Sequence, residues 1–240
     1  RYKIRGDGIT KQELYEAPPA AADKIMTKTL IFIAIPIVLT SLANSVTSLV
    51  DVTMVKWQLN RIVGDSSDVI RNMYASSIAD YNLSSQEALN DLEIPTFLYG
   101  IRGKAFTLYN LIPTITSVLG VSALPVLASS WTKQDKQLIK HNIESPIKFT
   151  ALISMPAGMG FLFMGTQIMG LVYNTTASYE IGGTMLRIYG LAAMFAGLAI
   201  PMTSMLQSIG KEIISLRNVA IGAIIKVFVN FIFVGIPSIN

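Results

Sequence analysis

The stretch YGIRGKAFTLYNLIPTITSVLGVSALPVLASSW, residues 99–131, decides the fold class of this chain. It begins with Arg102 and Lys104 among glycines and continues as an apolar body over residues 105–129. A helix needs about 20 apolar residues to cross the hydrocarbon of a bilayer, so this body is long enough. Cations and the helix-interrupting Pro113 and Pro125 are tolerated in lipid where they face protein or a polar cavity. We therefore predict a transmembrane helix that lines something polar.

The composition of the whole chain also indicates a membrane protein. Of its 240 residues, 51% are hydrophobic and 14% are charged, and the mean hydropathy is +0.50. Charged residues make up about a quarter of a typical soluble domain. The chain has no cysteine and one histidine, which excludes disulfides, thiol nucleophiles and multi-histidine metal sites. Hydrolase, zinc-protease and phosphate-loop motifs are also missing. We predict no enzymatic activity, no cofactor and no metal site.

Five apolar segments predict an all-α, polytopic bundle of transmembrane helices. The expected spans are residues 29–55, 97–131, 146–173, 184–207 and 214–236. We expect three kinds of connection: a polar lead-in or linker at 1–28, loops at 56–96 and 174–183, and an amphipathic helix at 132–145 that lies on the bilayer surface. The loop at 56–96 is long enough to have structure of its own, and Ser84 or Ser85 would cap a short helix at 84–93. Because the chain starts at Arg1 and ends just after an apolar segment, we expect it to be an internal piece of a longer protein.

The distribution of basic residues predicts the orientation of the spans. Residues 1–28, 132–148 and 208–218 would share one side of the membrane, and together they contain twelve Lys and Arg. On the opposite side, the 56–96 loop contains three and the 174–183 loop none. Basic residues accumulate in cytoplasmic segments. We therefore predict a multi-pass protein of the cell membrane with a cytoplasmic N-terminal segment.

Lys226 is the clearest charged residue inside a predicted span. A cation at the bilayer centre costs at least about 2.5–3.5 kcal/mol, so it normally faces a partner or a cavity. Asn230 lies one helical turn further on the same face. Two interpretations stay open for Lys226: an ion pair with an acid such as Asp51, or contact with a substrate. Asp51 itself lies near the end of its span, where a charge at the membrane boundary is equally plausible.

Arg102 and Lys104 lie two residues apart, which places them about 200° apart around a helix. Both can face one cavity only if Gly103 distorts the helix, and we expect at least one to extend to the lipid headgroups. The first span has its own polar positions at three- and four-residue steps, which predicts a stripe facing protein or water. These positions are Thr40, Ser41, Asn44, Thr47, Ser48 and Asp51.

Four stretches of the sequence, in this order, resemble a known transporter family. They are IAIPIVLTSLANSVTSLVDVTMV (33–55), GKAFTLYNLIPTITSVLGVSALPVLASSW (103–131), KQDKQLIKHNIESPIKFTALISMPAGMG (133–160) and MLQSIGKEIISLRNVAIGAIIKVFVNF (205–231). The chain resembles the polysaccharide-biosynthesis and stage V sporulation protein B-like flippases of the multidrug/oligosaccharidyl-lipid/polysaccharide (MOP) superfamily, relatives of the lipid II flippase. The resemblance implies two helical lobes around a central cavity. Residues 29–240 would form part of the second lobe, about half of such a transporter, and the 56–96 loop exceeds the family pattern.

The resemblance also implies a function and partners. It implies alternating-access transport of lipid-linked oligosaccharides or of peptidoglycan or polysaccharide precursors, through a cationic cavity. The partners would be membrane lipids, a prenyl-pyrophosphate-linked glycan and the missing first lobe of the same protein, with no nucleic acid. Lys104 lies in the G-K-A stretch and Asn110 in the N-x-x-P stretch, which makes these two firmer cavity candidates than Arg102. The full set of cavity candidates is Lys104, Lys226, Asn230, Asn110, Arg102, Asn44 and Asp51.

Three alternatives to the flippase remain open from the sequence. A drug/cation antiporter of the same superfamily would need acids within the membrane, for which Asp51 is the candidate. A membrane enzyme of cell-wall glycan synthesis would need a large outer domain or clustered catalytic residues. A non-transporting scaffold for the same pathway would lack the first lobe altogether.

Overall fold

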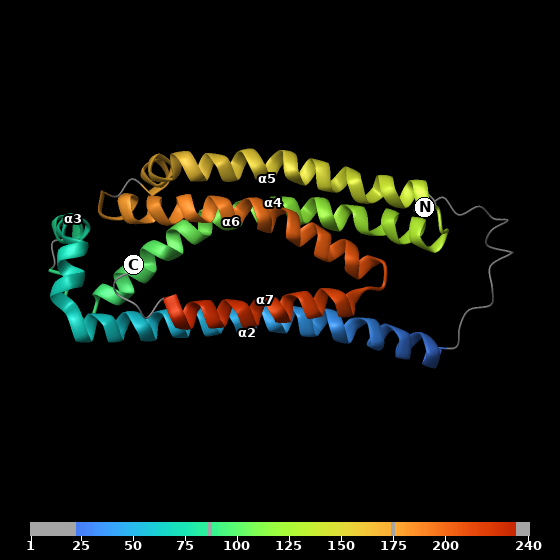
Figure 1. The fold of residues 1–240 in the computed structure, drawn as a ribbon, viewed down its shortest axis with the longest axis horizontal. Coiled ribbons are helices and arrows are strands. Elements are labelled where there is room, and N and C mark those ends of the chain that lie inside the picture. The colour runs from blue at the N-terminus through green and yellow to red at the C-terminus, as the bar shows by residue number, and fades with distance from the viewer. Residues whose placement is uncertain (1–22, 86–87, 174–175, 234–240) are drawn as a thin grey trace, which may run out of the picture.

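The fold is a bundle of long helices, as the sequence predicts. The computed structural model describes residues 23–85, 88–173 and 176–233, apart from a few of their side chains, and all regular structure in these ranges is helical. The helices are α2 (Asp23–Met73), α3 (Ala75–Ser85), α4 (Ile94–Thr132), α5 (Lys136–Tyr173), α6 (Thr176–Ser208) and α7 (Glu212–Phe233). Figure 1 shows α4, α5 and α6 packed together, while α7 runs along α2. Most of the linker predicted at residues 1–28 lies outside the described residues.

Four of the described helices, α2, α4, α5 and α6, are long and apolar enough to cross a membrane. Helix α7 has 22 residues and is not among these four, so the fifth span remains a prediction. The start of α2, the α4–α5 turn and the α6–α7 turn all lie at one end of the bundle (Figure 1). This is the up-and-down order that alternating spans require.

The prediction that a loop begins near residue 56 is wrong, because α2 continues without a break to Met73. No proline occurs between Pro36 and Pro95, and residues 56–73 retain apolar positions at helical spacing. At about 1.5 Å per residue, the 51 residues of α2 measure about 77 Å, more than twice the ~30 Å of the hydrocarbon layer. The far part of α2 therefore extends beyond the membrane.

The far part of α2, helix α3 and the start of α4 form a separate hydrophobic core. Its buried members are Ile62, Val63, Ile70, Ile78, Leu89, Ile94 and Leu98. Tyr74 at the α2–α3 corner packs against this core, and burial raises the pKa of its hydroxyl. The expectation that the 56–96 segment has structure of its own is thus confirmed. We call residues 56–98 the end subdomain.

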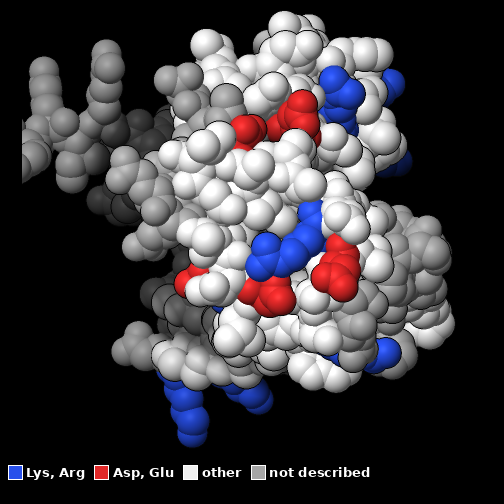
Figure 2. Space-filling view, turned by 90° about the vertical axis from the view of Figure 1, so that its left-hand side faces the viewer, with Lys and Arg blue, Asp and Glu red and all other residues white. Residues whose placement is uncertain are grey.

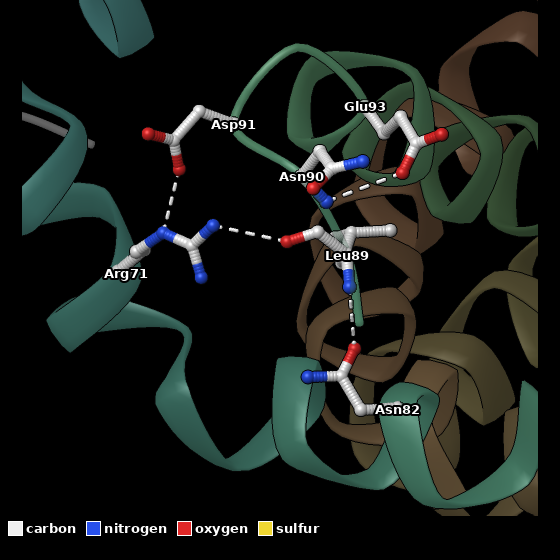
Figure 3. Close-up of polar contacts among 6 residues, drawn as sticks. All are labelled: Arg71, Asn82, Leu89, Asn90, Asp91 and Glu93. Carbon is white, nitrogen blue, oxygen red and sulfur yellow. Dashed lines mark hydrogen bonds and ion pairs between the residues drawn. The ribbon is translucent and has the colours of Figure 1, made fainter. Parts of the chain in front are cut away.

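The helix predicted at residues 84–93 is not present over residues 88–93, and residues 86–87 lie outside the described residues. Ser84 and Ser85 instead end α3, and residues 88–93 make an irregular turn into α4. Side chains satisfy the backbone of this turn (Figure 3): Arg71 donates to the Leu89 carbonyl at 2.9 Å and pairs with Asp91 at 2.6 Å. The Leu89 N–H donates to the side chain of Asn82 at 2.9 Å. These tertiary contacts replace the helical hydrogen bonds that the local sequence predicts.

The end of the bundle that carries the end subdomain has a mixed charge pattern. Figure 2 views this end and shows acidic and basic side chains close together among uncharged surface. The Arg71–Asp91 ion pair belongs to this region, and both side chains are about half-exposed. Such exposed pairs contribute little stability and serve mainly to hold chain segments in place.

Two further predicted boundaries are wrong. Residues 136–145 are not a separate surface helix but the first turns of α5, which continues through Pro146 and Pro156. Asp135 starts the helix, because its carboxylate accepts the backbone N–H groups of Gln137 and Leu138, both at 3.0 Å. The loop predicted at 174–183 is also shorter than expected, since α6 begins at Thr176.

Glycines allow α5 and α6 to approach closely. A Cβ atom on Gly190 would lie 2.6 Å from the carbonyl oxygen of Gly158, and one on Gly158 would lie 2.7 Å from the carbonyl oxygen of Gly190. Small residues at such crossings are typical of transmembrane helix packing, where van der Waals contact replaces the hydrophobic effect. Helices α5 and α6 are therefore tightly joined at this crossing.

Candidate functional site

The most buried charge in the described bundle interior belongs to Asp51 on α2, and it is paired with residues from α7. The side chain of Asp51 is 10% exposed and forms an ion pair with Lys226, whose side chain is 48% exposed. The Asn230 amide donates to the other carboxylate oxygen at 2.7 Å. Asn230 lies one turn beyond Lys226, so one face of α7 supplies both partners. Of the two interpretations of Lys226, the structure shows the ion pair with Asp51.

Arg102 on α4 lies among aromatic rings on the side of α4 that approaches α6. Its guanidinium lies 5.4 Å from the ring centre of Tyr99 and 5.7 Å from that of Phe106, and it also contacts the hydroxyl of Tyr99 at 3.5 Å. Tyr189 of α6 is a further hydrogen-bonding neighbour. A cation over aromatic faces is stabilised without a counter-ion. Arg102 is half-buried and is held in place by these contacts.

Tyr189 faces Arg102 from α6. Its hydroxyl is a hydrogen-bonding neighbour of Arg102, and the charge of Asp51 also acts on it. Its ring also packs against Phe106 at 5.9 Å and Tyr109 at 5.4 Å. Side chains from α2, α4, α6 and α7 thus converge on one region. We call this set the polar cluster: Asp51, Arg102, Tyr189, Lys226 and Asn230.

Lys104 points to a different part of the bundle. Its ammonium group lies 5.5 Å from the ring centre of Tyr173 at the end of α5, and its carbonyl accepts a hydrogen bond from the Tyr173 hydroxyl at 3.1 Å. The predicted angular separation of Arg102 and Lys104 is therefore visible in their different neighbours. Arg102 lies near Tyr99 and Phe106, whereas Lys104 lies near Tyr173.

The remaining two candidates lie apart from these contacts. Asn110 is half-buried on α4, one turn before the buried Pro113. Asn44 is exposed on α2, where its carbonyl accepts the hydroxyl of Ser48 at 3.0 Å. The predicted polar stripe of the first span is divided in the same way: Thr40 and Asp51 are buried, whereas Ser41 and Ser48 are exposed and bond to their own helix.

Sequence reasoning missed two polar residues of this region. Tyr189 reads as an ordinary aromatic residue of an apolar span, and no local signal marks its contacts. Gln58 falls in the stretch that the sequence predicts to be a loop, but it is 4% exposed on α2, and its side-chain oxygen has no hydrogen-bond partner within the described part of the protein. It lies seven residues after Asp51, about 20° away around the helix. A continuous helix through residue 58 would have revealed this common face.

The charges around the polar cluster are predominantly positive. Lys56 lies 5.2 Å from the ring centre of Tyr99, the same ring that Arg102 contacts. Lys56, Arg102 and Lys226 thus outnumber the single acid Asp51. Within the described residues, no group of three or more His, Asp or Glu side chains could hold a metal ion. The arrangement is suited to holding an anionic group by charge and by hydrogen bonds from Arg, Lys, Asn and Tyr.

Membrane-spanning helices that converge on a charged cluster define the chain as part of a polytopic membrane protein. Residues 102–232 match the MatE family, and the chain belongs to that family. The resemblance to the MOP superfamily is therefore confirmed.

Comparison with curated proteins gives a further similarity. The chain is 22% identical over 118 residues to the lipid II flippase MurJ of Bacillus subtilis (strain 168). The aligned segment covers 49% of this chain and 22% of that protein. No solved structure shows a significant match.

Proposed function

We propose that this chain forms part of a flippase that moves an anionic, lipid-linked glycan precursor across the bacterial cell membrane. The observation that carries the proposal is the excess of cations at the polar cluster: Lys226 pairs with the acid Asp51, while Arg102 and the nearby Lys56 both lie over the ring of Tyr99. Membership of the MatE family and the similarity to a lipid II flippase support it.

The physical task of such a flippase is to carry a charged head group through oil while its prenyl tail stays in the lipid. A pyrophosphate is stabilised by Arg and Lys, and most strongly where water is scarce. Arg102 and Lys226 would contact the phosphate charge, and Asn230 would add a neutral hydrogen bond. Movement of α2 and α7 relative to the α4–α6 layer would expose the cluster to each side in turn. Lys104 is a further candidate for contact with the substrate.

One observation favours a second candidate, a drug/cation antiporter. Asp51 is a carboxylate within a span, and a cationic substrate or coupling ion would need such a group. In the conformation described here, however, Lys226 already neutralises that carboxylate. An antiporter would have to displace Lys226 before Asp51 could bind another cation, so the geometry favours an anionic substrate.

Complementation of a flippase-deficient bacterial strain by the full-length protein tests this proposal. We expect rescue by the wild type and loss of rescue when Arg102→Gln is combined with Lys226→Gln, with unchanged amounts of protein in the membrane. Arg217→Gln is the matched control, because Arg217 is an exposed cation on the same helix as Lys226. Full rescue by the double variant would contradict the role of the cationic cluster.

A parallel measurement of drug resistance separates the two candidates. If the wild type fails to rescue growth but raises resistance to cationic drugs, and Asp51→Asn abolishes that resistance, the antiporter is correct and the flippase is not. The same strains can carry a reporter on either terminus to test the predicted cytoplasmic location of the N-terminal segment.

A further inference from the structure

A pocket between α4 and α5 lies far along both helices from the polar cluster. Its volume is about 250 Å³, and it is close to the end of the bundle where α4 turns into α5. Its lining residues are Leu119, Ser122, Ala123, Val126, His141, Asn142, Ser145, Pro146 and Phe149. Neither the proposed transport nor the family match gives this pocket a role.

The lining combines polar and apolar groups. His141, Asn142 and Ser145 on α5 and Ser122 on α4 provide the polar groups. Leu119, Val126 and Phe149 provide apolar surface, and Val126 and Phe149 are 54% and 58% exposed. Val126 is six residues from the end of α4, about 9 Å along the axis, and Leu119 is 13 residues away, about 20 Å. The pocket therefore lies within about 20 Å of the end of α4.

Lysines lie on α5 close to the residues that line the pocket, and none of them is itself a lining residue. Residues 133–148 contain four lysines and two acids, for a net charge of +2. Lys148 is seven residues after His141, so the two lie about 20° apart on one face of α5. The side chain of Lys148 is 75% exposed and is held by Glu144 at 3.2 Å. Asp135 is occupied in capping α5, which leaves the lysines in excess at this end.

We propose that this pocket binds an anionic phospholipid, with the phosphate near Lys148 and His141 and the upper acyl chains against Val126 and Phe149. A polar pocket between transmembrane helices with lysines close by has the chemistry that anionic headgroups require. Its volume is below the roughly 300–1,000 Å³ of sites for drug-sized ligands, which suits a small headgroup. The exposed apolar wall is solvated by lipid tails and is continuous with the pocket.

The proposal is tested with the full-length protein purified in a neutral detergent. Native mass spectrometry would count bound phosphatidylglycerol and phosphatidylcholine, each added at matched concentrations, and glycerol phosphate would serve as a soluble headgroup. We expect selective retention of phosphatidylglycerol. Lys148→Gln should weaken this retention about fivefold, equivalent to about 1 kcal/mol for one lysine near an anionic headgroup. Lys28→Gln, an exposed lysine near the start of α2, should leave it unchanged.

A second variant addresses the shape of the pocket. Ser145→Leu fills the polar part and should reduce phosphatidylglycerol retention without changing the charge. Equal retention of both lipids would overturn the proposal, and so would retention that neither variant alters. Competition by glycerol phosphate at the same concentration would also overturn it, because the site would then recognise a free phosphate rather than a lipid. None of these outcomes depends on whether the protein is a flippase.

Discussion

Removal of Lys226 should destabilise the protein more than removal of its partner Asp51. Lys226→Met leaves the Asp51 carboxylate, whose side chain is 10% exposed, with the hydrogen bond from Asn230 but without its counter-ion. Breaking a fully buried ion pair costs about 3–5 kcal/mol. Because the Lys226 side chain is 48% exposed, solvent already screens part of this interaction, and we expect a loss of about 1–2 kcal/mol.

Asp51→Asn should cost less, below about 1 kcal/mol. The amide has nearly the same size and still offers an oxygen to Asn230, and the half-exposed Lys226 can extend its ammonium group toward polar surroundings. The double variant Asp51→Asn, Lys226→Met has no unpaired charge at this position. Its stability loss should therefore be smaller than the sum of the two single losses, by about 1 kcal/mol.

The free energy of unfolding can be measured by denaturant titration in detergent micelles, with the fluorescence of Trp57 and Trp131 as the signal. Arg217→Met removes an exposed cation from the same helix and should change stability by less than about 0.5 kcal/mol. The reasoning is refuted if Lys226→Met costs no more than Asp51→Asn, or if the two single losses add without coupling.

Two further predictions concern packing and the end subdomain. Gly190→Ala should destabilise the bundle by about 1–3 kcal/mol in the same titration, because the added Cβ would lie 2.6 Å from the carbonyl oxygen of Gly158. Gly64→Ala is the control and should not destabilise the bundle, because a Cβ at residue 64 meets open space. Arg71→Ala should cost only about 0.5–1 kcal/mol, since the side chains of Arg71 and Asp91 are both about half-exposed. It should nevertheless speed proteolytic cleavage within residues 88–93, whereas Lys211→Ala should not. Unchanged stability of Gly190→Ala, or unchanged cleavage of Arg71→Ala, would contradict the contacts described.

The helical spans were predictable because lipid imposes a strong length and polarity requirement. The apolar body from residue 105 to 129 is recognisable on composition alone, and α4 contains it. The helix ends were less predictable, because the sequence alone does not show where a helix continues beyond the membrane. Residues 56–73 are polar enough to resemble a loop, yet Ile62, Val63 and Ile70 find a core with α3 and α4.

The candidate site was predictable in its residues but not in its contacts. An isolated cation in an apolar span identifies Lys226, and helical periodicity adds Asn230. From the sequence, an ion pair with Asp51 was one of two interpretations of Lys226. The resemblance to the transporter family favoured Lys104 over Arg102 as a cavity residue. Periodicity places residues around one helix, but it cannot determine which neighbouring helix each face meets.

By itself, the sequence determined that this chain is an all-α membrane protein with prolines and isolated charges inside its spans. The reason is that lipid requires long apolar segments whose backbone is hydrogen-bonded as a helix, and such segments can be recognised from composition and helical periodicity. The sequence also showed which residues share a helical face. Only the tertiary structure decided that α7 lies along α2, that Lys226 and Asn230 therefore meet Asp51, and that Arg102 reaches Tyr189 while Lys104 meets Tyr173. The physical reason is that each of these contacts joins residues far apart in the chain, and helix packing brings them together.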